Sequence, residues 1–367
     1  LDANTTASNN TAIGYSAMTT NTTGANNTAV GRAALASNIT GADNTALGYN
    51  ALFANTSGLR NVAVGYLSLT ANTSGDNNTA VGRGTLTSNT TGAHNTALGY
   101  QALAVNTSGL RNVAVGYLSL DANTSGDDNT AVGKGTLTSN TTGYDNTAVG
   151  YEALAANTTA WGNVAVGYQS LDANTTGDQN TAVGYNSMTS NTSGEFNVAV
   201  GRSALSSNTT ADNNTAVGYY SLLSNTTGIN NVAVGSYSLD ANTTGTGNSA
   251  IGVNALGKNT GGVNNTAVGS GAMVDNTTGE YNVGLGVGAM SATTTGSYNT
   301  AVGGNVMLAN TTGQFNAAFG YRALVANTTG EDNISVGAYS LDGNTVGAGN
   351  VAVGRATLGA NTTGNDN

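Results

Sequence analysis

The chain has 367 residues, with 53 Gly, no Pro and no Cys, and only 8% of its residues are charged. Its formal net charge of −10 argues against nucleic acid as a partner, because phosphate binding requires a basic stripe. Without Cys there are no disulfides and no thiol chemistry. No apolar run approaches the roughly 20 residues that span a bilayer, so we expect no membrane insertion in this segment.

A 17-residue repeat runs through the chain. A Gly recurs at this interval from Gly14 to Gly354, without insertion or deletion. A period this strict is typical of a solenoid, in which each repeat is one turn of the same structure. We predict a single continuous repeat domain over residues 1–367, and we interpret it as a segment of a longer fibre or a unit that joins end to end.

Each repeat is numbered from its Asn, so that Asn112 is position 1 and Gly116 is position 5. Positions 2 to 4 carry strand-forming residues, and positions 12 to 15 have turn chemistry, as in Asn123-Thr124-Ser125-Gly126. Two nearly fixed Gly in each repeat exclude a helix. We expect two strands per coil, at positions 1–5 and 7–11. The fold class is then all-β, a parallel β-solenoid (β-roll) of about 21 coils with 17 residues per coil.

Asn stands at position 1 of every repeat and at position 12 of every repeat but one. Stacked coils place these side chains above one another, so that each amide can bond the next and fix the register. The predicted Asn ladders in three central repeats are Asn95, Asn112 and Asn129 at position 1 and Asn106, Asn123 and Asn140 at position 12.

Position 3 is Ala in nearly every repeat, as at Ala97, Ala114 and Ala131. Two explanations fit so small a side chain. The first, which we favour, is an external stripe kept flat by another subunit packed against it. The second is a crowded position inside the coil itself.

Large apolar residues recur at positions 4 and 9. If positions 2 and 4 point inward, side chains at positions 4 and 9 stack on their own copies and form the interior. The predicted core residues are Leu98, Val115 and Val132 at position 4 and Leu103, Leu120 and Leu137 at position 9.

Position 6 is an outward position rich in Tyr and basic residues, including Tyr100, Tyr117, Lys134 and Tyr151. Interfaces and glycan-binding surfaces favour such residues, which makes this row a candidate surface-binding track. The alternative is that Tyr simply has a high preference for β-sheets.

No constellation for catalysis, cofactor binding or metal binding stands out. The single His, His94, lies in an expected turn. Acidic residues at positions 16 and 17, such as Asp127 and Asp128, form an irregular row that we interpret as solubilising turns. The Asn-Thr-Thr runs match the glycosylation pattern, but turn chemistry explains them equally well.

The NTAVGY and NVAVGY runs, such as Asn112 to Tyr117, resemble the NSVAIG-type strand of YadA-like head domains. Those domains belong to the trimeric autotransporter adhesins, and similar repeats occur in phage tail-fibre proteins. The resemblance implies a left-handed β-roll, a trimer in which Ala114 and its copies face partner subunits, and an extracellular fibre that attaches to surfaces. The 17-residue period is longer than the family's usual one, so the second strand or outer loop must be longer.

We therefore expect a structural extracellular fibre or adhesin shaft on a cell surface or virion, without catalysis. Its expected partners are copies of itself, as a trimer or an end-to-end polymer, and a host surface or glycan. A first alternative is a receptor- or glycan-binding phage tail fibre that uses the Tyr track. A second alternative is ice binding by the Thr residues at positions 13 and 14. Ice binding needs outward Thr on one flat face, whereas these two Thr are neighbours in an expected turn and point to opposite sides, so we disfavour it.

Overall fold

The structure is a computed structural model that describes residues 3–367. It divides into two compact units, Leu1–Asn180 (unit 1) and Thr181–Asn367 (unit 2). Both units repeat the same coil, and residues 3–367 contain β-strands and turns but no helix. The continuity of residues 1–367 as a single domain stays a prediction.

Every coil contributes one short strand, at positions 2 to 4. In unit 1 the strands are β1 (Thr11–Ile13), β2 (Thr28–Val30), β3 (Thr45–Leu47), β4 (Val62–Val64), β5 (Thr79–Val81), β6 (Thr96–Leu98), β7 (Val113–Val115), β8 (Thr130–Val132), β9 (Thr147–Val149) and β10 (Val164–Val166). In unit 2 they are β11 (Thr181–Val183), β12 (Val198–Val200), β13 (Thr215–Val217), β14 (Val232–Val234), β15 (Ser249–Ile251), β16 (Thr266–Val268), β17 (Val283–Leu285), β18 (Thr300–Val302), β19 (Ala317–Phe319), β20 (Ile334–Val336) and β21 (Val351–Val353).

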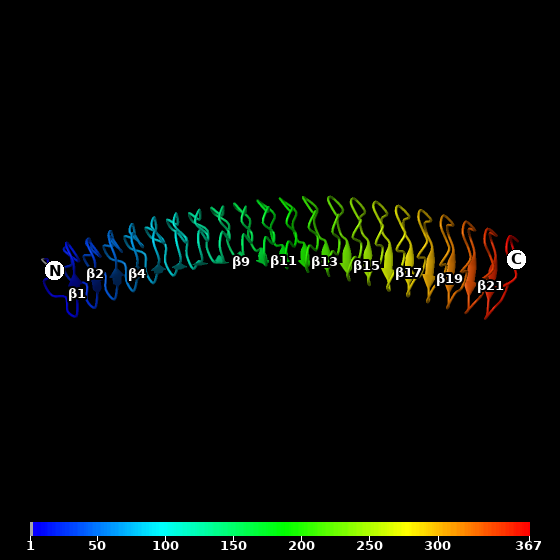
Figure 1. Ribbon diagram of the computed structural model, residues 1–367, viewed down its shortest axis with the longest axis horizontal. Helices are drawn as coiled ribbons and strands as arrows, with labels where there is room; N and C mark the ends of the chain where they lie inside the picture. The colour runs from blue at the N-terminus through cyan, green and yellow to red at the C-terminus, as the bar shows by residue number, and fades with distance from the viewer. Residues whose placement is uncertain (1–2) are drawn as a thin grey trace. The chain divides into compact units, whose positions relative to one another are not determined.

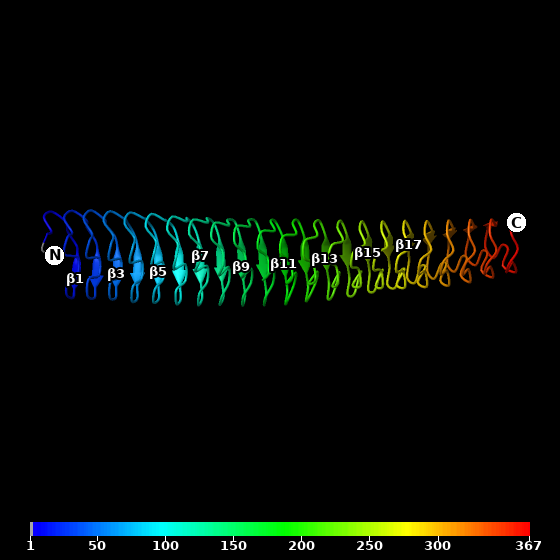
Figure 2. The same cartoon turned by 90° about the horizontal axis from the view of Figure 1, so that it is seen from above.

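Within each unit, successive strands pair in parallel and in register. Val113 of β7 lies beside Thr130 of β8, and Ala114 lies beside Ala131, so each residue pairs with its counterpart one repeat later. Figures 1 and 2 show the strands of each unit side by side with their arrows in one direction. The predicted all-β parallel solenoid with one coil per 17 residues is confirmed.

The predicted second strand at positions 7–11 is absent from the described coils. Leu118 at position 7 and Leu120 at position 9 both have φ of 52°, in the left-handed region. This conformation breaks the extended backbone that a strand needs and costs L-residues roughly 1–2 kcal/mol. The segment still bonds its neighbours, because Leu118 donates to the Tyr100 carbonyl and Leu120 donates to the Thr136 carbonyl.

The orientation of the strand is opposite to the one predicted. Ala97, Ala114 and Ala131 are completely buried within their own chain, so they are not a subunit interface. Leu98 is 47% exposed, and Val115 and Val132 are only half-buried, so these position-4 residues are not core. The predicted position-9 residues Leu103, Leu120 and Leu137 are fully buried.

The narrow interior explains this orientation. Position 3 faces position 9, as the single coil with Gly at position 3 shows. A Cβ on Gly284 would lie 3.0 Å from the Met273 sulfur and 3.5 Å from Cε of Met290. Once Leu or Met fills the coil from one side, only a small side chain fits on the other, which is Ala in most coils and Ser335 in one. The crowded interior therefore accounts for the Ala at position 3, and the larger residues at positions 2 and 4 must point outward.

The Gly at position 5 is required by a close approach between coils. Gly116 has φ of +139°, and a Cβ on it would lie 2.3 Å from the carbonyl oxygen of Gly133 in the next coil. Non-Gly residues cannot adopt this backbone without strain, and no side chain fits in the gap. This explains why the Gly of the 17-residue period never changes.

Candidate functional site

Two buried rows of Asn hold successive coils in register. At position 1, the backbone N–H of Asn112 donates to Oδ1 of Asn95 at 2.9 Å, and Nδ2 of Asn112 donates to the same oxygen at 3.2 Å. At position 12, Nδ2 of Asn123 donates to Oδ1 of Asn106 at 2.9 Å. The structure places all six predicted ladder residues in these rows: Asn95, Asn112, Asn129, Asn106, Asn123 and Asn140.

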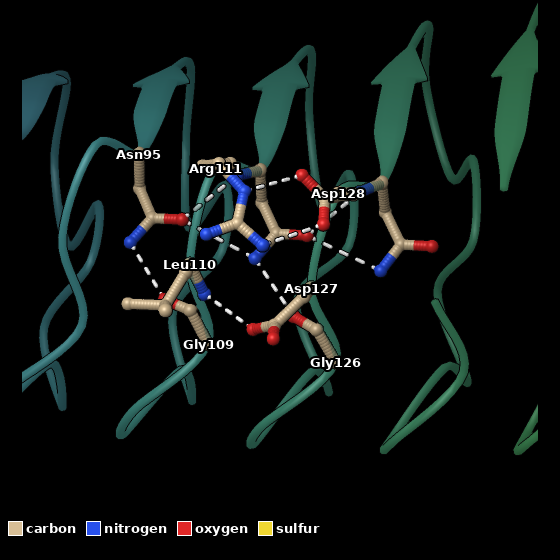
Figure 3. A network of polar contacts seen from close by, with 9 residues as sticks. Asn95, Gly109, Leu110, Arg111, Gly126, Asp127 and Asp128 are labelled. Carbon is tan, nitrogen blue, oxygen red and sulfur yellow. Dashed lines mark hydrogen bonds and ion pairs between the residues drawn. The ribbon is translucent and has the colours of Figure 1, made fainter. Parts of the chain in front are cut away.

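The two rows also close each coil. The carbonyl oxygen of Gly126 at position 15 accepts from Nδ2 of Asn112 at 2.8 Å and from Nδ2 of Asn123 at 3.0 Å. Figure 3 shows the position-1 half of this pattern, in which Asn side chains of successive coils reach toward Gly109 and Gly126. The buried polar atoms are thus paired within the coil and between coils, as burial requires.

One coil of unit 2 breaks the position-12 row. Thr293 stands where the other coils have Asn, and it has no amide to donate. Oδ1 of Asn276 and Oγ1 of Thr293 are both buried without a hydrogen-bond partner. The defect marks a local loss of stabilisation in an otherwise regular row.

The predicted surface track forms a continuous column of exposed side chains at position 6 in unit 1. Its rings stack in pairs, with centroids 5.3 Å apart for Tyr49 and Tyr66, 5.3 Å for Tyr100 and Tyr117, and 5.0 Å for Tyr151 and Tyr168. The column consists of Tyr15, Arg32, Tyr49, Tyr66, Arg83, Tyr100, Tyr117, Lys134, Tyr151 and Tyr168.

Cations stand between the ring pairs. The guanidinium carbon of Arg83 lies 5.6 Å from the ring centre of Tyr66 and 5.7 Å from that of Tyr100. Nζ of Lys134 lies 5.3 Å from the ring centre of Tyr151. Cation–π contacts of this kind hold the charged groups against the rings, so the column has a fixed arrangement with flat aromatic faces and positive charge.

The corresponding column of unit 2 is interrupted. After Tyr185, Arg202 and Tyr219 it changes to small or aliphatic residues. A different aromatic stack stands at position 17, where the ring centroids of Tyr281 and Tyr298 are 5.2 Å apart and those of Tyr298 and Phe315 are 5.1 Å apart. The residues that interrupt the column are Ser236, Val253, Ser270, Val287 and Gly304.

Acidic residues at positions 16 and 17 bond the preceding coil. Oδ1 of Asp127 accepts from the backbone N–H of Leu110 at 2.7 Å, and Asp128 forms an ion pair with Arg111 at 2.6 Å (Figure 3). The hydrogen bond from Arg111 lowers the pKa of the Asp128 carboxyl. The sequence-based interpretation of Asp127 as a solubilising turn residue missed its role as an acceptor for an otherwise unpaired amide.

The Asp side chains at position 10 of the described coils are partly withdrawn from solvent. Burial raises the pKa of Asp121, Asp172 and Asp240. Oδ1 of Asp121 and Oδ1 of Asp172 have no hydrogen-bond partner. No signal in the sequence points to these residues, because position 10 also accepts Thr, Ser and Ala.

The other residues that could take part in catalysis or metal binding do not form a site in the described residues. His94 is exposed, and its backbone N–H donates to the Asp76 carbonyl. Within residues 3–367, no three His, Cys, Asp or Glu side chains gather into a group that could hold a metal ion. The same part of the chain has no helix of the length and apolarity needed to cross a membrane.

The outward strand face is the surface that the sequence-based prediction missed. Positions 2 and 4 of every strand in both units carry only Thr, Ser, Ala, Val, Ile, Leu or Phe. Many of these side chains are exposed, among them Ile13 at 61% and Leu47 at 46%. The missing signal was the size of the coil interior, which decides which face of the strand points outward.

No protein-family model matches the chain, and no curated protein matches it.

Proposed function

We propose that this chain is a structural segment of an extracellular fibre or adhesin shaft, and that its copies associate through the outward strand faces. The observation that carries the proposal is an uncharged, largely apolar face on each unit, in a chain whose net charge is −10. A contiguous exposed apolar surface is typical of an interface. Identical chains with a net negative charge repel one another where their acidic surfaces meet. Contact through an uncharged face avoids this repulsion.

The repeat itself supports a partner that is another copy. Rows of Thr and Val recur with the same spacing in every coil, so the face of one copy matches the face of another along its length. The resemblance to YadA-like head repeats suggests three copies around a common axis. The contact now involves positions 2 and 4 in place of the buried Ala114 and its copies.

Sedimentation-velocity ultracentrifugation across a concentration series tests this proposal. The wild-type chain is expected to sediment as a trimer, and the double variant Val115→Asp/Val132→Asp as a monomer. Ser125→Asp/Thr142→Asp is the matched control, because it adds the same charge to the exposed turns of the same two coils. A wild-type chain that stays monomeric at every concentration would contradict the proposed association.

A second candidate function is attachment to a surface glycan through the position-6 column of unit 1. The specific observation in its favour is the ordered row of stacked rings and interleaved cations around Tyr100, Tyr117 and Tyr151. Binding to an array of surface polysaccharides is expected to disappear when these three residues become Ala. It is expected to survive Tyr281→Ala/Tyr298→Ala, which removes a stack of the same chemistry from another column.

A further inference from the structure

The position-6 column of unit 1 borders a hollow of about 370 Å³. It opens where Gly135 stands at position 7, between the Leu118 side chain of one adjacent coil and the Glu152 side chain of the other. A Cβ on Gly135 would lie 3.4 Å from Cγ of Glu152, in ordinary van der Waals contact, so a larger side chain at this position would occupy part of the hollow. The volume falls within the range of small-molecule sites, which is about 300–1,000 Å³.

The walls of the hollow combine an apolar surface with hydrogen-bonding groups of both kinds. Tyr117 and Leu118 contribute a ring and an aliphatic side chain, and Lys134 contributes a donor. Glu152 and Asp172 contribute carboxylate acceptors, and Thr138 contributes a hydroxyl that donates to the Gly135 carbonyl at 2.6 Å and keeps its lone pairs available.

Several of these groups are held in place by neighbours. Tyr117 stacks on Tyr100, and Lys134 lies over the ring of Tyr151. Glu152 accepts a hydrogen bond from Nε2 of Gln169 at 2.9 Å, and this bond lowers the pKa of its carboxyl. Preorganised walls reduce the entropy that binding must overcome.

We infer that the hollow at Gly135 binds one neutral hexose unit of a glycan. A hexose has an apolar C–H face that suits Tyr117 and Leu118, and hydroxyls that both donate to Glu152 and Asp172 and accept from Lys134. Two carboxylates against one ammonium disfavour sulfated, phosphorylated or carboxylated sugars. The inference rests on the second candidate function and assigns the hexose to a specific place beside the column.

The chain contains its own control for this site. Asn44–His94 and Asn95–Asp145 are near-identical blocks, and Gly84 in the first block corresponds to Gly135 in the second. At the Gly84 position Gln101 stands in place of Glu152, so one of the two carboxylates is missing. Leu67 and Leu118 occupy position 7 of the neighbouring coils with φ of 55° and 52°, so Leu is compatible with this backbone.

The experiment is saturation-transfer NMR on the whole chain with methyl glycosides of glucose, galactose and mannose. The wild-type chain is expected to give a signal with at least one of them. Gly135→Leu is expected to reduce the signal at least tenfold, and Gly84→Leu is expected to leave it unchanged. Glu152→Gln, which reproduces Gln101 of the other block, is expected to weaken binding severalfold without filling the hollow. Circular dichroism is expected to show the same fold for all three variants.

Two outcomes would overturn the inference. The first is the absence of saturation transfer to the wild-type chain from all three glycosides. The second is equal binding by Gly135→Leu and the wild-type chain. If polysaccharide binding then still required Tyr100, Tyr117 and Tyr151, attachment through the column would stand and only the hollow would be wrong.

Discussion

The two units have interiors built from the same repeated residues but differ in the column at position 6. In unit 1 this column is an unbroken row of Tyr, Arg and Lys, whereas in unit 2 it changes to Ser, Val and Gly between Ser236 and Gly304. Over the same coils of unit 2 the buried rows scarcely change, with Thr293 and Gly284 as the departures. The contrast shows that sterics and buried hydrogen bonds fix the residues of the interior, while the residues of the outer column are free to vary.

The largest expected effect comes from the invariant Gly of the interior. Gly116→Ala places a Cβ 2.3 Å from the Gly133 carbonyl oxygen on a backbone with φ of +139°. We expect the free energy of unfolding to fall by about 2–5 kcal/mol, from backbone strain and overpacking together. Urea unfolding followed by circular dichroism measures it. Gly135→Ala is the matched control and is expected to cost less than about 1 kcal/mol, because Ala33 occupies position 7 with φ of 55°.

The next largest effect is expected from the Asn rows. Asn123→Ala removes the donor to Oδ1 of Asn106 and the acceptor of Nδ2 of Asn140. Each buried group left without a partner costs roughly 1–3 kcal/mol, so we expect a loss of about 2–4 kcal/mol in urea unfolding. The exposed Ser108→Ala serves as the control. A loss no larger than that of the control would mean that the row does not stabilise the stack.

Thr293→Asn tests the same row in the opposite direction. The new amide would donate to the unpartnered Oδ1 of Asn276, and its oxygen would accept from Asn310. We expect unit 2 to gain about 1–2 kcal/mol of stability. Thr293→Ser, which restores no amide, should give no gain. A destabilised Asn variant would show that this coil has adapted its backbone to Thr.

The outer column is expected to contribute little to stability. Tyr117→Ala removes one ring stack with Tyr100 on an exposed surface, for which we expect a loss of about 0.5–1 kcal/mol. Urea unfolding measures this loss, and a loss clearly smaller than that of Asn123→Ala is expected if the column serves binding and not folding. A loss as large as that of the Asn variant would place the column among the structural rows.

The smallest effect is a pH dependence at Asp172. Burial raises the pKa of its carboxyl in the folded state, so the folded chain binds this proton more tightly than the unfolded chain. Its contribution to stability is therefore greatest below the unfolded pKa and falls as the pH rises through the folded pKa. Asp172→Asn is expected to raise stability slightly at neutral pH and to remove this part of the slope, as measured by urea unfolding at a series of pH values.

Much of the fold could be predicted from the sequence, because the constraints that matter recur with the period. The fixed Gly gave the coil length, and the Asn at positions 1 and 12 gave the ladders. The left-handed backbone at Leu118 and Leu120 could not be predicted, since Leu carries no signal for positive φ. Predicting the orientation of the strand also requires the width of the coil interior, which the sequence of a single repeat does not give. The hollow at Gly135 is lined by residues of four successive coils, so the sequence of a single repeat could not predict it.

The inward position of Ala114 decides which face of the strand is free for partners, and maleimide labelling of Ala114→Cys over a dilution series tests it most directly. The chain has no native Cys, so the label reports a single site, and Tyr117→Cys provides the exposed reference. We predict that the Ala114→Cys variant stays unlabelled at every protein concentration and reacts only when the chain unfolds. If the Ala114→Cys variant were labelled as fast as the Tyr117→Cys variant once the chains are diluted apart, position 3 would face outward, and the inward orientation would be contradicted.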